Sequence, residues 1–167
     1  MNREIKFRGK SQGDNSFVYG SYVHSDDSKN NPFRYEYKEK HQILTYFPGD
    51  WNMGGYEYVD VDPDTVGQYT GLKDKNGVEI YEGDILRTDD LVLVDNQYVP
   101  TYCYGVVFWN KSDCGFSESV WKRIVDGNVG FVGGAVYMLT DLNLEETVVI
   151  GNIYDNPELI GGEEDKP

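Results

Sequence analysis

The segment 65–86 constrains the fold of this chain more than any other part of the sequence. Two short runs rich in β-branched and apolar residues, 65–72 and 78–81, flank the pair Asn76-Gly77. An Asn-Gly pair between two such runs predicts a β-hairpin with a type I′ turn, which needs positive φ at both central residues. A second turn at residues 82–84 follows directly. The segment therefore predicts closely spaced antiparallel strands.

Strand patterns recur along the rest of the chain. Residues 5–8 and 17–23 predict an opening hairpin, and residues 56–62 alternate until Pro63, which cannot donate to a strand ladder. Further strands are expected at 91–94, 102–109, 129–139 and 147–154. A helix of about two turns is expected at 116–125, capped by Ser117, and one turn at 158–160. Residues 142–146 are too short to decide.

Together these patterns predict a mainly β fold, with small barrel-like or sandwich antiparallel sheets and one or two short helices. The 19 glycines and the aromatic content of 14% agree with short strands and many turns. We expect a single domain at 1–160, with two lobes at 1–63 and 64–160 as the alternative. The acidic tail, 161–167, is expected to be disordered.

The chain is strongly acidic and unevenly charged. Its formal net charge is −14, whereas residues 1–40 alone carry +2. Such a body repels nucleic acid, whose binding depends on Lys and Arg, and it favours solubility or a partner with a basic face. No apolar run approaches the length of about 18–20 residues that spans a bilayer, and the charged start is unlike a signal peptide. Two cysteines are too few for a disulfide framework, so we expect free thiols and a cytoplasmic protein.

Several blocks of the chain are similar to those of a known family. Residues 65–85 resemble the signature of the YopX family, and so do 3–8, 18–20, 105–108 and 149–159. Relative to that family, residues 25–57 and 88–101 resemble insertions. The resemblance implies a phage or prophage protein in a bacterial host, a mostly β fold and homo-oligomers. It implies no reaction and no catalytic residue.

No catalytic, cofactor or metal site is expected from the motifs. The triplet Asp60, Asp62 and Asp64 resembles the start of a calcium loop, but that loop needs Gly and Glu where Thr65 and Gly71 stand. We expect Asp60 and Asp62 to share a solvated strand face.

The remaining reactive side chains are few. His24 and His41 lie seventeen residues apart, outside any metal-ligand spacing, and are expected to be surface histidines. Cys103 or Cys114 would be a nucleophile only beside a histidine.

Two groups of residues are candidates for binding. The first is a basic strand with an aromatic neighbour, Phe7, which suits nucleic acid unless its cations pair internally with carboxylates. Its cations are Arg3, Lys6, Arg8 and Lys10. The second is an aromatic surface suited to protein contacts, whose rings would otherwise form a second small core. Its members are Tyr35, Tyr37, Tyr46, Trp51, Tyr56 and Tyr58.

The sequence therefore predicts a non-catalytic phage or prophage accessory protein that binds a macromolecule in the host cytoplasm. The expected partner is a protein, with a host protein or a second copy of the chain as candidates. A nucleic-acid-binding module is the alternative, and an enzyme with an unrecognised site is a third. No cofactor and no membrane contact are expected.

Overall fold

The computed structural model describes residues 4–25, 39–49, 54–125, 127–139 and 144–160. The mainly β prediction is confirmed: the regular structure consists of two antiparallel sheets and short 3-10 turns. Across the described ranges the sheets do not close into a barrel. The chain divides into two compact units, Met1–Tyr69 and Thr70–Pro167. The expected tail at 161–167 lies outside the described residues.

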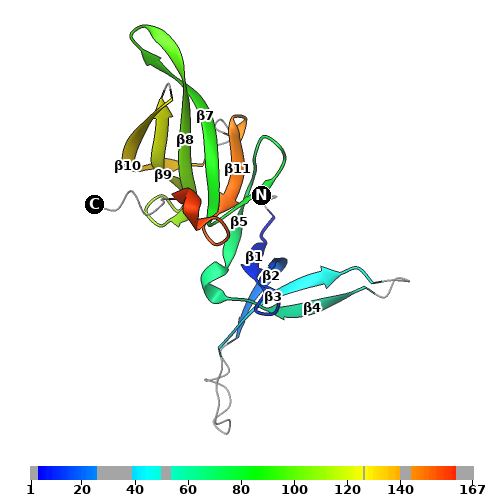
Figure 1. The fold of residues 1–167 in the computed structure, drawn as a ribbon. Coiled ribbons are helices and arrows are strands. Elements are labelled where there is room, and N and C mark those ends of the chain that lie inside the picture. The colour runs from blue at the N-terminus through cyan, green and yellow to red at the C-terminus, as the bar shows by residue number, and fades with distance from the viewer. Residues whose placement is uncertain (1–3, 26–38, 50–53, 126, 140–143, 161–167) are drawn as a thin grey trace. The chain divides into compact units, whose positions relative to one another are not determined.

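The first unit is built on strands that pair in the order β4-β3-β2-β1-β5 (Figure 1). They are β1 (Phe7–Lys10), β2 (Phe17–Ser25), β3 (Lys40–Phe47), β4 (Gly55–Asp60) and the start of β5 (Gly67–Lys73). The expected opening hairpin is confirmed, with Lys10 opposite Phe17 across β1 and β2. Ile43 and Val61 are fully buried and form the centre of this unit.

Strand β4 ends two residues earlier than its alternating pattern predicts. Val61 makes only an isolated bridge to Ser11. Asp62 instead caps the 3-10 turn η3 (Pro63–Thr65), where its Oδ1 accepts a hydrogen bond of 3.1 Å from the backbone N–H of Asp64. The expectation that Asp60 and Asp62 share a strand face is therefore wrong, because a capping side chain turns towards the next backbone N–H groups.

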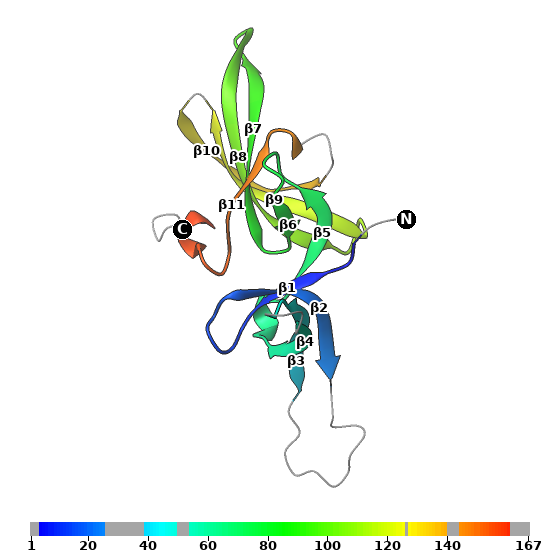
Figure 2. The ribbon, with the colours of Figure 1, turned by 90° about the vertical axis from the view of Figure 1, so that its right-hand side faces the viewer.

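The second unit contains the end of β5 and a sheet in the order β10-β9-β8-β7-β11 (Figure 2). Its elements are β6 (Glu79–Tyr81), β7 (Asp84–Val94), β8 (Gln97–Asn110), β9 (Gly115–Val125), β10 (Asn128–Met138), β11 (Thr147–Asn152) and η4 (Pro157–Ile160). The core cluster consists of Ile80, Leu86, Val107 and Leu144. Removing these apolar side chains from water stabilises the unit.

The helix expected at residues 116–125 is wrong, because this segment is strand β9. It pairs with β8 on one side and β10 on the other, so its backbone groups are satisfied by two neighbouring strands. A helix of two turns has no comparable stabilisation. The terminal turn expected at 158–160 is confirmed as part of η4. Over the part of the chain that the structure describes, no helix is long and apolar enough to cross a membrane.

The turn at Asn76-Gly77 is not of type I′. Only Gly77 has a positive φ, at 81°, and its N–H donates to the carbonyl of Asp74 at 2.9 Å. A type I′ turn occurs instead at Asp95 and Asn96, between β7 and β8, where the φ angles are 47° and 67°. Both positions tolerate positive φ because the short polar side chains of Asp and Asn bond locally.

Candidate interaction surface

Three of the predicted surface tyrosines gather on one face of β3 and β4. Tyr46 and Tyr56 are direct cross-strand partners, and their rings meet edge to face at a centroid distance of 5.4 Å. Tyr58 shares their face because alternate residues of a strand point the same way. Their exposed fractions are 55% for Tyr46, 73% for Tyr56 and 61% for Tyr58. We call these three residues the tyrosine face.

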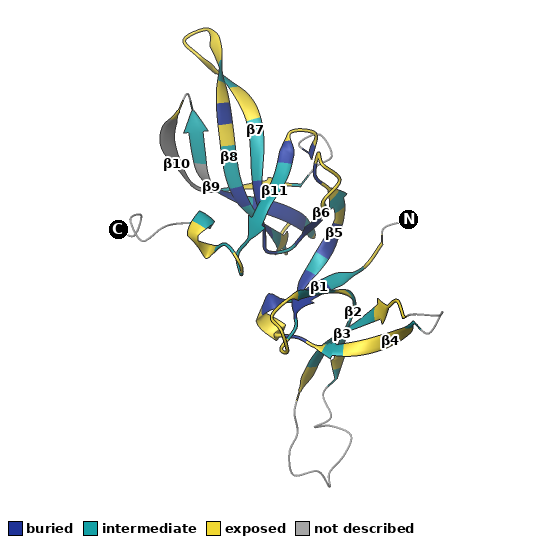
Figure 3. Cartoon of the chain, turned by 45° about the vertical axis from the view of Figure 1, so that its right-hand side comes forward, coloured by how far each residue is buried: buried dark blue, intermediate teal, exposed yellow. Residues whose placement is uncertain are grey.

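The tyrosine face lies at the edge of its sheet. Strand β4 is the last strand in the order, and Figure 3 shows exposed residues along it. Its acidic residue Glu57 is exposed between Tyr56 and Tyr58 and points to the opposite face. The other predicted members, Tyr35, Tyr37 and Trp51, lie outside the described residues. Exposed rings with a hydroxyl suit a protein interface, because one end is apolar and the other can hydrogen-bond.

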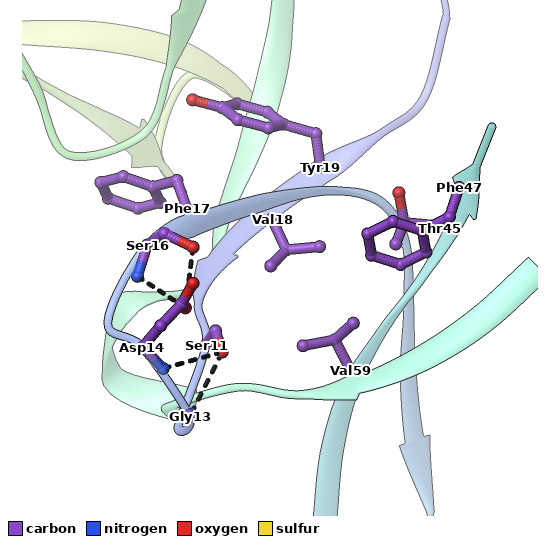
Figure 4. A pocket seen from close by; sticks show the side chains of 10 residues that line it. All are labelled: Ser11, Gly13, Asp14, Ser16, Phe17, Val18, Tyr19, Thr45, Phe47 and Val59. Carbon is purple, nitrogen blue, oxygen red and sulfur yellow. Dashed lines mark hydrogen bonds between the residues drawn. The ribbon is translucent and has the colours of Figure 1, made fainter. Parts of the chain in front are cut away.

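The opposite face of the same strands carries a hollow of about 450 Å³ (Figure 4). Val18, Val59 and Phe47 form its apolar wall. On its polar side, the Asp14 carboxylate accepts hydrogen bonds from the backbone N–H and the hydroxyl of Ser16, at 3.1 and 2.8 Å. These bonds, led by that from the hydroxyl, lower the pKa of Asp14. The hollow is therefore an open depression that joins an apolar wall to one carboxylate.

Two cations of the predicted basic strand are buried. Arg8 and Lys10 are only 5% and 6% exposed. Both lie over the ring of Phe17, with centroid distances of 4.6 Å for Arg8 and 5.5 Å for Lys10. Lys6 pairs with Glu4 at 3.6 Å, and Arg3 lies outside the described residues. Cations held over aromatic rings stabilise the fold and are poorly placed to neutralise phosphates.

His24 and His41 are brought together by the pairing of β2 with β3. They are directly opposite one another in the register, and their rings stack at a centroid distance of 4.7 Å. The sequence predicts two separate surface histidines, because the register of a hairpin with a long connection is not visible in the sequence. Alternation within 17–25 and 40–47 would have placed each on a strand, but not opposite the other.

A second depression, of about 350 Å³, lies in the second unit and contains a buried acid. Glu118 on β9 is 8% exposed, and its Oε1 has no hydrogen-bond partner among the described residues. Burial raises the pKa of Glu118 to about 7. Its side chain occupies the space above Gly105, where an added Cβ would overlap Glu118 Cγ. The predicted sites do not include Glu118, because its burial is not visible in the sequence and nothing in its sequence context distinguishes it from exposed glutamates.

The two cysteines are free. Cys103 is half-buried beside Arg123, whose Nε donates to the thiol at 3.4 Å, and Cys114 is exposed. Both belong to the second unit, whereas His24 and His41 belong to the first. Gly77 and Gly83 lie in turns and have positive φ, whereas Gly71, which also has a positive φ, lies within strand β5.

The sheets and the exposed tyrosine face define a mainly β protein with a candidate protein-binding surface. The chain belongs to the YopX protein family, whose model matches residues 6–161. This match confirms the resemblance seen in the sequence. Among solved structures, the chain is similar to protein EF1440 from Enterococcus faecalis, with 22% identity and a TM-score of 0.47 over 95% of this chain and 99% of that chain. No curated protein matches it.

Proposed function

We propose that this chain is a phage or prophage accessory protein that binds another protein in the cytoplasm of the bacterial host and performs no catalysis. The tyrosine face carries the proposal. Its three rings are each more than half exposed and lie together on an edge strand pair. Tyrosine is enriched at protein interfaces because a ring buries a large area at little cost in side-chain entropy.

The charge of the chain indicates the kind of partner. With a formal net charge of −14, the protein attracts a protein with a basic face and repels acidic ones at long range. Complementary charge accelerates the encounter of the two proteins. The tyrosine rings, once buried in the complex, supply most of the affinity.

The non-catalytic part of the proposal is supported by the placement of the reactive groups. A cysteine nucleophile is activated by an adjacent base. Cys103 instead accepts a hydrogen bond from Arg123, and no histidine is among the described residues that line its depression.

Photo-crosslinking tests the proposal at the level of one residue. A photoreactive phenylalanine analogue is placed at Tyr56 and, as a matched control, at Tyr98 on β8, since both tyrosines are 73% exposed. We expect the probe at position 56 to crosslink one host or phage protein with a basic surface, and the probe at position 98 to leave that protein unlabelled. Equal labelling from both positions, or labelling from neither, would contradict the proposal.

The captured protein is then purified and its affinity measured at increasing salt. We expect Tyr56→Ser and Tyr58→Ser each to weaken binding by at least about 1 kcal/mol, or about fivefold, while Tyr98→Ser changes nothing. Added salt should slow association, because it screens the charge attraction. Unchanged affinity in both β4 variants would show that another surface makes the contact.

The nucleic-acid alternative has its own test. We expect fluorescence anisotropy at low salt to detect no binding of labelled single-stranded or double-stranded DNA, because Arg8 and Lys10 are buried. Binding that weakens steeply with salt and is abolished by Lys6→Glu would favour the alternative.

A further inference from the structure

Three potential metal ligands meet at the end of the β2–β3 ladder. Besides the stacked pair His24 and His41, the cluster contains Glu39, which directly precedes β3. Glu39 Oε1 lies 2.6 Å from His24 Nε2 and 3.8 Å from His41 Nε2. All ligand atoms of the cluster lie within 4.8 Å of one another.

We propose that His24, Glu39 and His41 bind one Zn²⁺ ion. Two imidazoles and one carboxylate form a donor set that suits this borderline-soft cation. Metal–ligand bonds of about 2.0–2.2 Å place two ligands of a tetrahedral ion about 3.4 Å apart. The distance of 3.8 Å between Glu39 and His41 is already close to that value. The shorter distance of 2.6 Å between Glu39 Oε1 and His24 Nε2 is that of a hydrogen bond. A bound ion would replace the proton of this bond.

The backbone holds the two imidazoles in a suitable arrangement. Directly opposite residues in antiparallel strands have Cβ atoms about 4.5–5.5 Å apart, so two histidines reach a common point without moving the chain. Their rings are nearly parallel, with an interplanar angle of 22°. Small rotations of the side chains therefore turn both Nε2 atoms towards one ion.

Tyr22 contacts His41 on the side of the ring that faces away from the proposed ion. Its hydroxyl lies 2.5 Å from His41 Nδ1, the ring nitrogen that would not contact the ion. In the zinc-bound state Nδ1–H donates to the tyrosine oxygen, which leaves the Nε2 lone pair free for the metal. Such partners behind metal-binding histidines fix the tautomer and orient the ring.

The surroundings leave room for water to complete the coordination. Side-chain exposure is 42% for His24, 60% for Glu39 and 20% for His41. A depression of about 500 Å³ adjoins Glu39 and His41, and Lys40 and Asp60 also line it. The positive charge of Lys40 disfavours the binding of a cation and the negative charge of Asp60 favours it, so the two effects offset each other in part.

A surface ion pair is the competing explanation of the cluster. A single exposed pair of this kind contributes little stability and needs only one histidine. Here a second histidine is stacked on the first, and Tyr22 fixes its other nitrogen. The metal site accounts for all four side chains together.

Calorimetric titration of the chelator-treated full chain with zinc chloride tests the proposal. We expect one ion per chain, and at least about tenfold weaker binding in each of His24→Ala, His41→Ala and Glu39→Gln. Tyr22→Phe should weaken binding by about tenfold, while Glu57→Gln, a matched exposed carboxylate on β4, should not. Cys103→Ser with Cys114→Ser should also retain binding. Unchanged affinity in the histidine variants would overturn the site.

A second measurement avoids any folding defect of the variants. The chain contains only two histidines, so long-range ¹⁵N–¹H spectra show two imidazole rings. We expect one equivalent of zinc to shift the Nε2 signals of both rings together. Imidazole signals that do not shift when zinc is added at neutral pH would exclude the site.

Discussion

The carboxylate of Asp74 accepts a hydrogen bond of 3.0 Å from the backbone N–H of Val149, which follows 75 residues later. The other carboxylate oxygen accepts from the backbone N–H groups of Asn76 and Val78, at 2.8 and 2.9 Å. Asp74 is only 5% exposed. One buried side chain therefore shapes the turn after β5 and attaches it to β11.

Removing this acceptor should destabilise the second unit strongly. We expect Asp74→Ala to lower the free energy of unfolding by about 2–4 kcal/mol, because buried N–H groups lose a charged acceptor. Asp74→Asn should cost less, since an amide oxygen still accepts. Urea unfolding measures both. The control is Asp113→Ala, where an exposed carboxylate bonds only to the Asn110 side chain, and its effect should be within about 0.5 kcal/mol.

The turn that Asp74 shapes gives a second prediction. Gly77 has a φ of 81° and open space around the position of a Cβ, so its replacement tests backbone strain alone. We expect Gly77→Ala to destabilise the protein by about 1 kcal/mol. Gly115→Ala, where φ is not positive and a Cβ meets only ordinary contacts, should be neutral or slightly stabilising. Equal unfolding midpoints for the two variants would contradict the strained turn.

Glu118 predicts a specific pH dependence of stability. Its pKa is raised from 4.5 to about 7 in the folded protein, so the folded state holds a proton that the unfolded state releases. The contribution is fully present below about pH 4.5 and is lost as the pH rises through about 7. Relative to Glu118→Gln, the wild type should lose up to about 3 kcal/mol between these limits. Urea unfolding of both proteins over this range measures the difference, and parallel pH profiles would exclude the shift.

The tyrosine face also predicts self-association. We expect light scattering coupled to size exclusion to give more than the monomer mass of 19.1 kDa in about 0.15 M salt, where charges are screened beyond about 8 Å. Tyr56→Ser should restore the monomer, whereas Tyr98→Ser, with equal exposure, should not. A monomer in the wild-type protein would limit the tyrosine face to contacts with other proteins.

The local parts of the fold could be predicted from the sequence, and the non-local parts could not. Alternation and turn residues were enough for the hairpin of β1 and β2. Segment 116–125 pairs with its direct chain neighbours β8 and β10, but its apolar residues recur at a spacing that also suits a helix, so its pattern alone does not decide between the two. The Asn76-Gly77 pair predicts a type I′ turn, but the Asp74 carboxylate accepts from the backbone N–H groups of Asn76 and Val78 and so selects another turn.

For the candidate sites, too, the local features could be predicted from the sequence and the non-local ones could not. The tyrosines at 46, 56 and 58 could be chosen by residue type, because aromatic rings among charges and glycines seldom form a continuous core. The burial of Arg8 and Lys10 over Phe17 depends on the pairing of two strands. The meeting of His24 with His41 depends on a register across a long connection.

The fit of Glu118 over Gly105 has a consequence for how this chain can vary. An added Cβ at position 105 would occupy the space of the Glu118 side chain, which is itself buried. A larger residue at position 105 therefore overlaps Glu118 unless position 118 has already become smaller, and a smaller residue at position 118 alone leaves a cavity. In evolution or in a mutant library, substitutions at the two positions therefore depend on each other, and their order decides whether the intermediate folds.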